Sequence, residues 1–168
     1  WAVEEYIRAS GLAWTMVKPN FFMQNLLASA KSIREQGRFS LPMGGGTTGM
    51  ADARDIGAVC AEVLTGQGHA GKSYEITGPE LLTFNQVAER FSEVLGRKIE
   101  YVPMPMAQFR ERMTGVLKPW HLDAVCALFQ EIADIGLDHT TDTFRKLIGR
   151  EPIPLRQFIK DHIALFRA

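Results

Sequence analysis

Residues 18–25, KPNFFMQN, place polar amides and aromatic rings directly after an apolar segment. Amide groups donate and accept hydrogen bonds, and aromatic rings can form the walls of a site for a planar ligand. Residues 12–17 have the composition of a strand buried on both faces of a parallel sheet. Pro19 should end this strand, since proline has no N–H to donate to a neighbouring strand. Ligands of open parallel sheets bind beyond the carboxyl ends of strands, so the turn at residues 18–21 is the first candidate site.

Two aspartates near residue 50 are a second candidate for chemistry. Asp52 has the position of a helix N-cap, and Asp55 lies in the first turn, where the helix dipole favours an acidic side chain. We expect both to serve as capping groups and to pair with Arg54 or with a lysine elsewhere. A catalytic role is the alternative.

Glycines 44–46 could suggest a phosphate-binding loop. Such a loop lies between a strand and a helix N-terminus, usually with a lysine after it, whereas Thr-Thr-Gly-Met follows here. The sequence therefore predicts a surface hairpin turn.

Other reactive side chains form no recognisable constellation. The four histidines have no second ligand at the spacing of a metal site, so we expect surface or helix-capping roles for them and no bound metal. Cys60 and Cys126 fall within apolar helical patterns and are expected to be reduced core thiols, with a disulfide or a catalytic pair as the alternatives. There is no Gly-x-Ser-x-Gly motif, and Ser10 occupies the position where a lysine would complete a Tyr-x-x-x-Lys pair with Tyr6. The catalytic residues thus remain unidentified.

Helices and strands alternate in the first hundred residues. Apolar periodicity and breakers predict helices over 1–8, 22–36, 53–65 and 84–95, and strands over 12–17, 72–78 and 99–102. The remainder is mostly helical: residues 106–135 have a helical pattern in which Pro119 should occupy the first position of a second helix. Thr141 can cap a short helix over residues 142–148, and Pro154 should begin a last one. These patterns predict an α/β fold with parallel strands and flanking helices over residues 1–103, and a helical cap over residues 104–168.

The bulk composition excludes several classes of protein. The chain has 168 residues, is 46% hydrophobic, and its 19 basic residues balance its 19 acidic ones. This balance argues against a nucleic-acid partner or an anionic membrane. No apolar run is long enough to span a bilayer and no signal peptide is visible, so we expect a cytoplasmic protein. The helical pattern is already in progress at residue 1, which favours a piece of a longer protein over a chain that truly starts there.

Several motifs together resemble one family. Residues 10–25, SGLAWTMVKPNFFMQN, are similar to the stretch SGL-x-W/Y-T-x-x-R/K-P-x-x-F-M-x-N of NmrA-like proteins, which are atypical relatives of the short-chain dehydrogenases/reductases and bind NAD(P). The resemblance continues, in order, at residues 52–56, 74–79, 95–99 and 149–152. It implies the C-terminal portion of a Rossmann-like fold, without the Gly-rich dinucleotide turn that belongs to the other half.

The resemblance also implies a site. Pro19, Asn20, Phe21 and Phe22 would lie beside the nicotinamide of NADP or NAD. The substrate side would be lined by Met23, Asn25, Met50 and Phe109.

Three functions are compatible with this family. The first is an NAD(P)H-dependent oxidoreductase that passes a hydride to a quinone or small carbonyl substrate. The second is a non-catalytic redox sensor that binds NAD(P) and acts on a protein partner through its helical region. The third is a truncated domain without independent activity, which could form a homodimer through an exposed sheet edge.

Overall fold

The computed structural model describes residues 2–137 and 139–167, so Trp1 of the predicted first helix lies outside the described part. The helices and strands occur in the following order: α1 (Ala2–Ala9), β1 (Thr15–Pro19), the 3₁₀ helix η1 (Met23–Ser29), α2 (Ala30–Gln36), β2 (Arg38–Phe39), β3 (Thr47–Thr48), α3 (Ala53–Thr65), β4 (Lys72–Ile76), β5 (Leu82–Thr83), α4 (Phe84–Leu95), β6 (Glu100–Tyr101), α5 (Met106–Met113), α6 (Pro119–Asp134), α7 (Thr143–Ile148), α8 (Leu155–Asp161) and α9 (Ile163–Phe166). The mixed α/β class with parallel strands is confirmed.

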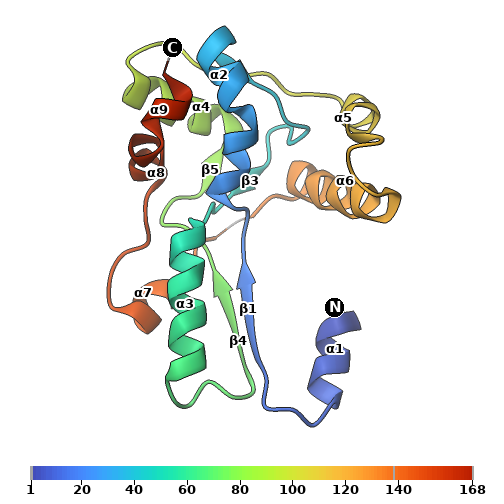
Figure 1. Ribbon diagram of the computed structural model, residues 1–168, viewed down its shortest axis with the longest axis vertical. Helices are drawn as coiled ribbons and strands as arrows, with labels where there is room; N and C mark the ends of the chain where they lie inside the picture. Colours follow the sequence, from blue (N-terminus) through green and yellow to red (C-terminus); the bar gives the residue numbers. More distant parts are fainter. Residues whose placement is uncertain (1, 138, 168) are drawn as a thin grey trace.

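The central element is a parallel pair of strands, β1 and β4, in which Val17 lies opposite Tyr74 and Pro19 opposite Ile76. Helices α3 and α7 lie on one side of this pair, and α5 and α6 lie on the other (Figure 1). Among the described residues, the other edge of β1 has no partner strand. Pairing of two copies through this edge stays a prediction, and a clean monomer in sizing chromatography of the chain would contradict it.

The first strand begins three residues and ends two residues later than the sequence predicts. Leu12 is exposed, and Pro19 is the last residue of β1 instead of its stop. The amide of Asn20 donates to the carbonyl oxygen of Ile76 (2.9 Å), so the ring nitrogen of Pro19 points away from β4. Because the missing N–H is on the unpaired edge, this proline costs the ladder no hydrogen bond.

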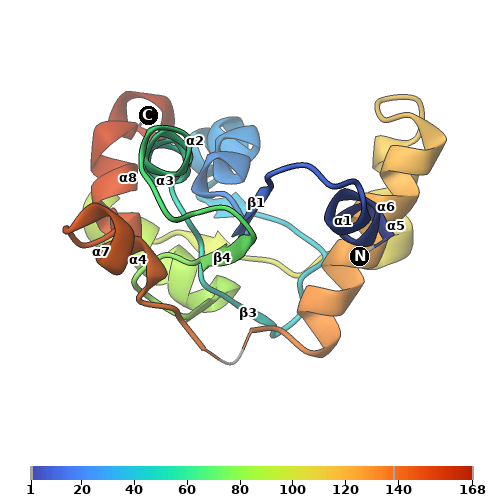
Figure 2. The same ribbon diagram turned by 90° about the horizontal axis from the view of Figure 1, so that it is seen from below.

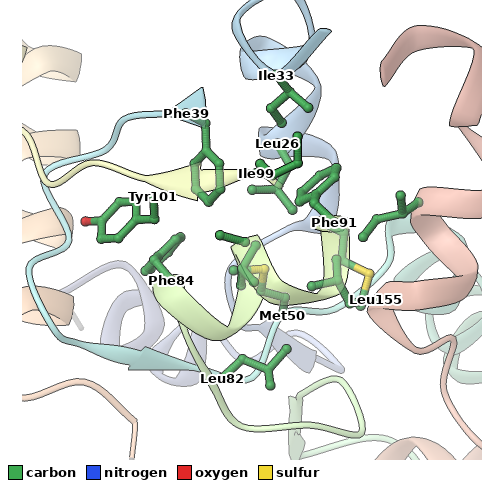
Figure 3. Packing of buried hydrophobic residues seen from close by; sticks show 14 of the residues in the cluster. Leu26, Ile33, Phe39, Met50, Leu82, Phe84, Phe91, Ile99, Tyr101 and Leu155 are labelled. Atoms are coloured by element: carbon green, nitrogen blue, oxygen red, sulfur yellow. The ribbon is translucent and has the colours of Figure 1, made fainter. Parts of the chain in front are cut away.

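One core joins elements that are far apart in the sequence. Phe39, Phe84 and Phe91 pack together with Leu155 of α8, as Figure 3 shows, and Phe166 of α9 contacts the ring of Phe91 with centroids 4.9 Å apart. Helices α8 and α9 therefore pack on α4 and α2, on the side of the molecule away from α5 and α6 (Figure 2). The last helices of the predicted cap region, residues 104–168, thus belong to the main core. We call α5 and α6 the cap helices; Phe129 and Ile132 of α6 pack against the edge of the same core.

Several helix ends confirm sequence rules. Thr83 and Gln86 form a reciprocal capping box, Asp52 accepts a hydrogen bond from the amide of Arg54, and Pro119 occupies the first position of α6.

Two predictions at helix ends are wrong. Thr141 caps no helix, because its hydroxyl donates to the carbonyl of Glu75, and the last predicted helix is interrupted at His162, which lies between α8 and α9.

The glycine run makes a turn but not a hairpin. The amide of Gly46 donates to the carbonyl of Met43 (3.0 Å), which closes the turn. The strands on either side pair elsewhere, β2 with β6 and β3 with β5. The hairpin prediction is wrong because both strands have long-range partners that a local pattern does not reveal.

Candidate functional site

A cavity of about 840 Å³ opens beside the carboxyl end of β1, between η1 and the cap helices. This volume lies within the range of sites for small molecules and cofactors. The cavity is lined by Pro19, Asn20, Phe21, Phe22, Gln24, Asn25, Ala28, Leu41, Thr47, Thr48, Phe109, Met113, Leu117, Val125, Leu128, Phe129, Glu131, Ile132, Gly136 and Leu137.

Most of the site residues predicted from the sequence meet in this cavity. They are Pro19, Asn20, Phe21, Phe22, Asn25 and Phe109. Two predicted residues, Met23 and Met50, are absent from the lining and lie in the core with 1% and 2% exposure. The reason is the backbone path: the amide of Met23 donates to the carbonyl of Ala51 (3.0 Å), which turns this part of the chain towards the core.

Aromatic rings form one wall of the cavity. The ring of Phe129 on α6 lies 5.1 Å from that of Phe109 on α5 and 6.3 Å from that of Phe21. Phe21 in turn meets the core ring of Phe84 edge to face, with centroids 5.9 Å apart. The wall is therefore anchored to the core, while Phe22, which is 38% exposed, lies at the more open side. Such a surface favours planar apolar ligands.

Asn20 provides the polar centre of the cavity. Its Oδ1 accepts hydrogen bonds from its neighbour's amide, Phe21 N (2.7 Å), and from the hydroxyl of Thr48 (2.7 Å). Its own amide continues the β1–β4 ladder. The side chain is thus held by three connected segments, β1, the following turn and β3.

Sequence reasoning missed the residues that β3 and α6 contribute. Thr48 reaches the site because β3 pairs antiparallel with β5, and Leu137 because its amide donates to the carbonyl of Thr47 (3.0 Å). The apolar face of α6, including Phe129 and Ile132, was visible as a helical pattern. Periodicity alone does not say whether such a face covers a core or a cavity.

Two buried aspartates position the elements around the cavity. Asp52 accepts hydrogen bonds from Gln24 of η1 (3.1 Å) and from the guanidinium of Arg54 (3.0 and 2.8 Å), which also reaches Asp161 of α8 (2.8 Å). The expected capping role and pairing with Arg54 are confirmed. Since Gln24 lines the cavity, this network joins η1 to α3 and α8.

Asp55 ties the segment after α7 to the start of α3. Its carboxylate accepts hydrogen bonds from Arg150 (2.7 Å) and from the backbone amide of Ile153 (2.6 Å), and the residue is 1% exposed. The sequence predicts Arg54 or a lysine as the partner of Asp55. In the structure the partner is an arginine 95 residues away. The position of Asp55 in the first turn of α3 gave no signal for this long-range contact.

The ionisation of Asp52 should make stability depend on pH. Burial by itself raises the pKa of Asp52, but hydrogen bonds from Arg54 and Gln24 outweigh it and hold the pKa below the usual value. The unfolded chain, with an aspartate pKa of about 3.9, therefore binds this proton more readily, so the stabilisation is present above that pH and is lost as the pH falls through the lower folded pKa.

We expect Asp52→Asn to flatten the fall in free energy of unfolding below about pH 4, measured by urea denaturation across pH. Asparagine is an equally good N-cap, so the variant isolates the ionic part. Glu111→Gln controls for the loss of one exposed carboxylate. An unchanged acid limb in Asp52→Asn contradicts the prediction.

In the described part of the chain, no group of three or more metal-binding side chains occurs, and no helix is both long and apolar enough to cross a membrane. His69 contacts the ring of Tyr74, with Nδ1 2.9 Å from its hydroxyl, and lies 3.9 Å from Glu62. It lies outside the cavity lining.

Comparison with known proteins gives the family. The model of the NmrA-like family matches residues 1–158. The chain belongs to the NmrA-like family. This NmrA-like chain is 40% identical over 166 residues to the NAD(P)H azoreductase of Xenophilus azovorans. The aligned segment covers 98% of this chain and 58% of the azoreductase. It is 28% identical over 161 residues to quinone oxidoreductase 2 of Escherichia coli, covering 93% of this chain and 55% of that protein.

Solved structures agree with this fold. The NADPH-dependent quinone oxidoreductase QOR2 of Escherichia coli matches with a TM-score of 0.84 at 27% identity, over 96% of this chain and 59% of that one. The same protein complexed with NADPH matches with a TM-score of 0.83. The chain spans somewhat over half the length of the curated relatives it matches, 58% for the azoreductase. The Rossmann-like fold predicted from the resemblance is confirmed over that part.

Proposed function

We propose that this NmrA-like chain is part of an NAD(P)H-dependent oxidoreductase that transfers a hydride to a quinone or small carbonyl compound. The observation that carries the proposal is the aromatic-walled cavity at the carboxyl end of β1, the position where open α/β sheets bind ligands. The names of its relatives, an NAD(P)H azoreductase and a quinone oxidoreductase, support this reaction class.

The residues present fit the reactive end of such a cofactor. A planar ring can lie against Phe21 and Phe22, with Pro19 fixing the turn and the Asn20 side chain beside it. When bound, a reduced nicotinamide supplies the hydride. Whether the cofactor is NADP or NAD depends on contacts with its adenosine half, so both belong to the proposal.

The chain's own residues would bind and orient the acceptor and exclude water. Phe109 and Phe129 of the cap helices contact each other across the cavity wall, and Leu128 and Ile132 extend the apolar surface. Asn25 adds an amide to the same lining. Exclusion of water from an apolar pocket strengthens each polar contact made inside it.

The test is consumption of NADPH by the complete parent protein with a panel of quinones and carbonyl compounds. We expect NADPH absorbance to fall with at least one acceptor, and Phe129→Ala to raise the KM for that acceptor several-fold by removing one ring from the wall. Leu64→Ala, which changes an exposed side chain on α3, is the control. Tight dinucleotide binding without turnover of any acceptor would contradict the proposal.

A second candidate, the redox sensor, is favoured by apolar side chains that the cap helices expose. Trp120 and Ile135 are 70% and 79% exposed, and Val116 between the two helices is 70% exposed. Among these residues, an exposed tryptophan is the type that is enriched in protein–protein interfaces. Capture of a partner protein that varies with the ratio of NADP to NADPH would support this candidate, and capture that is indifferent to the ratio would count against it.

A further inference from the structure

The side-chain amide of Asn20 has only one chemically acceptable orientation. The atom that faces the backbone amide of Phe21 must be the oxygen, because that N–H can only donate. The hydroxyl of Thr48 then donates to the same oxygen. If the amide were flipped, its NH2 group would face the N–H of Phe21 and the contact would become repulsive. The Nδ2 group is therefore fixed on the opposite side of the carboxamide.

The fixed NH2 group remains available to a ligand. Both recorded hydrogen bonds of the side chain end on Oδ1, and no hydrogen bond within the described residues engages Nδ2. Two other polar side chains of the cavity are already committed: Thr47 donates to the carbonyl of Leu137, and Gln24 binds Asp52 and the amide of Ala53. Asn25 and Glu131 also line the cavity, and no side-chain hydrogen bond within the described residues fixes the direction of either. Asn20 thus presents an oriented donor among apolar walls, where a hydrogen bond is electrostatically stronger than in water.

We propose that Asn20 donates from Nδ2 to the carbonyl oxygen of a planar ring bound in the cavity, and that Thr48 is the positioning residue that holds the donor in place. The proposal rests on the proposed function for the kind of ring expected. Two sources share this chemistry: a quinone-type acceptor, and the carboxamide of a nicotinamide ring. A bare aromatic ring of equal size would fill the same walls but leave the donor unpaired, which costs binding free energy.

Thr48 is suited to this role because burial and strand pairing fix the direction of its hydroxyl. It is 1% exposed, lies on β3 and directs its hydroxyl to Asn20 from a strand fixed by pairing with Leu82. Replacing it with valine preserves the shape and removes the hydroxyl. The remaining bond from Phe21 N would then hold the carboxamide alone, and the donor would lose part of its fixed direction.

The experiment measures binding without turnover, so it is independent of whether the reductase reaction occurs. Ligand-observed NMR on this chain compares two matched pairs: menadione with 2-methylnaphthalene, and 3-acetylpyridine, which represents the nicotinamide ring, with 3-ethylpyridine. Each pair differs by the carbonyl groups. We expect wild type to prefer the carbonyl member of at least one pair by about tenfold, the ratio that one hydrogen bond of ordinary net strength produces. The pair that shows the preference identifies the source.

Three variants make the result specific. Asn20→Asp keeps an oxygen for Phe21 and Thr48 but turns an oxygen towards the ligand, so the preference should fall to about one or reverse. Asn85→Asp adds the same charge at an exposed position of α4, outside the lining, and should keep the preference. Thr48→Val should reduce it several-fold, whereas Thr77→Val, which removes a hydroxyl from an equally buried threonine outside the lining, should not.

The readout is a ratio of two affinities, so a general loss of folded protein does not imitate it. Wild type that prefers neither carbonyl probe, including wild type that binds neither pair, overturns the proposal. So does an unchanged preference in Asn20→Asp. Loss of NADPH turnover in the parent protein with an intact preference would contradict the proposed function and leave the donor role of Asn20 standing.

Discussion

Gly46→Ala is expected to destabilise the chain by about 3 kcal/mol and to weaken ligand binding in the cavity. A Cβ atom at this position would lie 1.9 Å from the carbonyl oxygen of Ile132 and 2.7 Å from its carbonyl carbon. Both atoms are backbone, so no side chain can rotate away. The C-terminal end of α6 would have to move, and with it Ile132, which lines the cavity.

Urea denaturation and menadione binding measure the two parts of this effect. Gly45→Ala is a matched control one residue away, because a Cβ at Gly45 meets no atom within 4 Å. It should leave both quantities nearly unchanged. Equal behaviour of the two variants would show that α6 does not rest on this turn as the structure describes.

Asp55→Ala is expected to cost a similar amount, about 3 kcal/mol of the free energy of unfolding. The change leaves the backbone amide of Ile153 without its acceptor and the guanidinium of Arg150 without its counter-charge. Arg150 is about half exposed, so water recovers part of its loss, and the estimate lies at the low end of values for a broken buried pair.

The matched control is Asp123→Ala, which removes an aspartate from an exposed ion pair with Arg110 (2.6 Å). Exposed pairs contribute little, so its midpoint in urea should stay close to that of wild type. If both variants had the same midpoint, Asp55 would not join α3 to the segment after α7 in solution.

The sequence predicted the local features well because local chemistry determines them. Asp52, Thr83 and Pro119 occupy their helix positions because capping and ring geometry depend on a few neighbouring residues. The turn after β1 is predicted as the candidate site because the end of a buried strand is visible in composition, and the structure places this turn in the cavity lining. The predicted bounds of this strand are wrong because they assume that Pro19 ends it. The structure includes Pro19 in β1, since its nitrogen faces the unpaired edge.

The remaining site residues depend on contacts that no short window contains. Thr48 and Asn20 are 28 residues apart, and the pair formed by Asp55 and Arg150 spans 95. Met23 and Met50 are predicted to line the pocket, since flexible apolar side chains are common there. The hydrogen bond from Met23 N to Ala51 O instead directs this part of the chain towards the core, where both methionines are buried. Hydrophobic character predicts burial, and it does not distinguish a core from the wall of a cavity.

The packing of α8 and α9 on α4 and α2 has a consequence for biosynthesis. Phe158 and Phe166 complete a cluster whose other members begin at Phe21. Until α8 and α9 have been synthesised, Phe84 and Phe91 have no apolar cover on that side. The nascent chain therefore exposes an apolar surface until these two helices emerge from the ribosome, and this surface should bind chaperones during that interval.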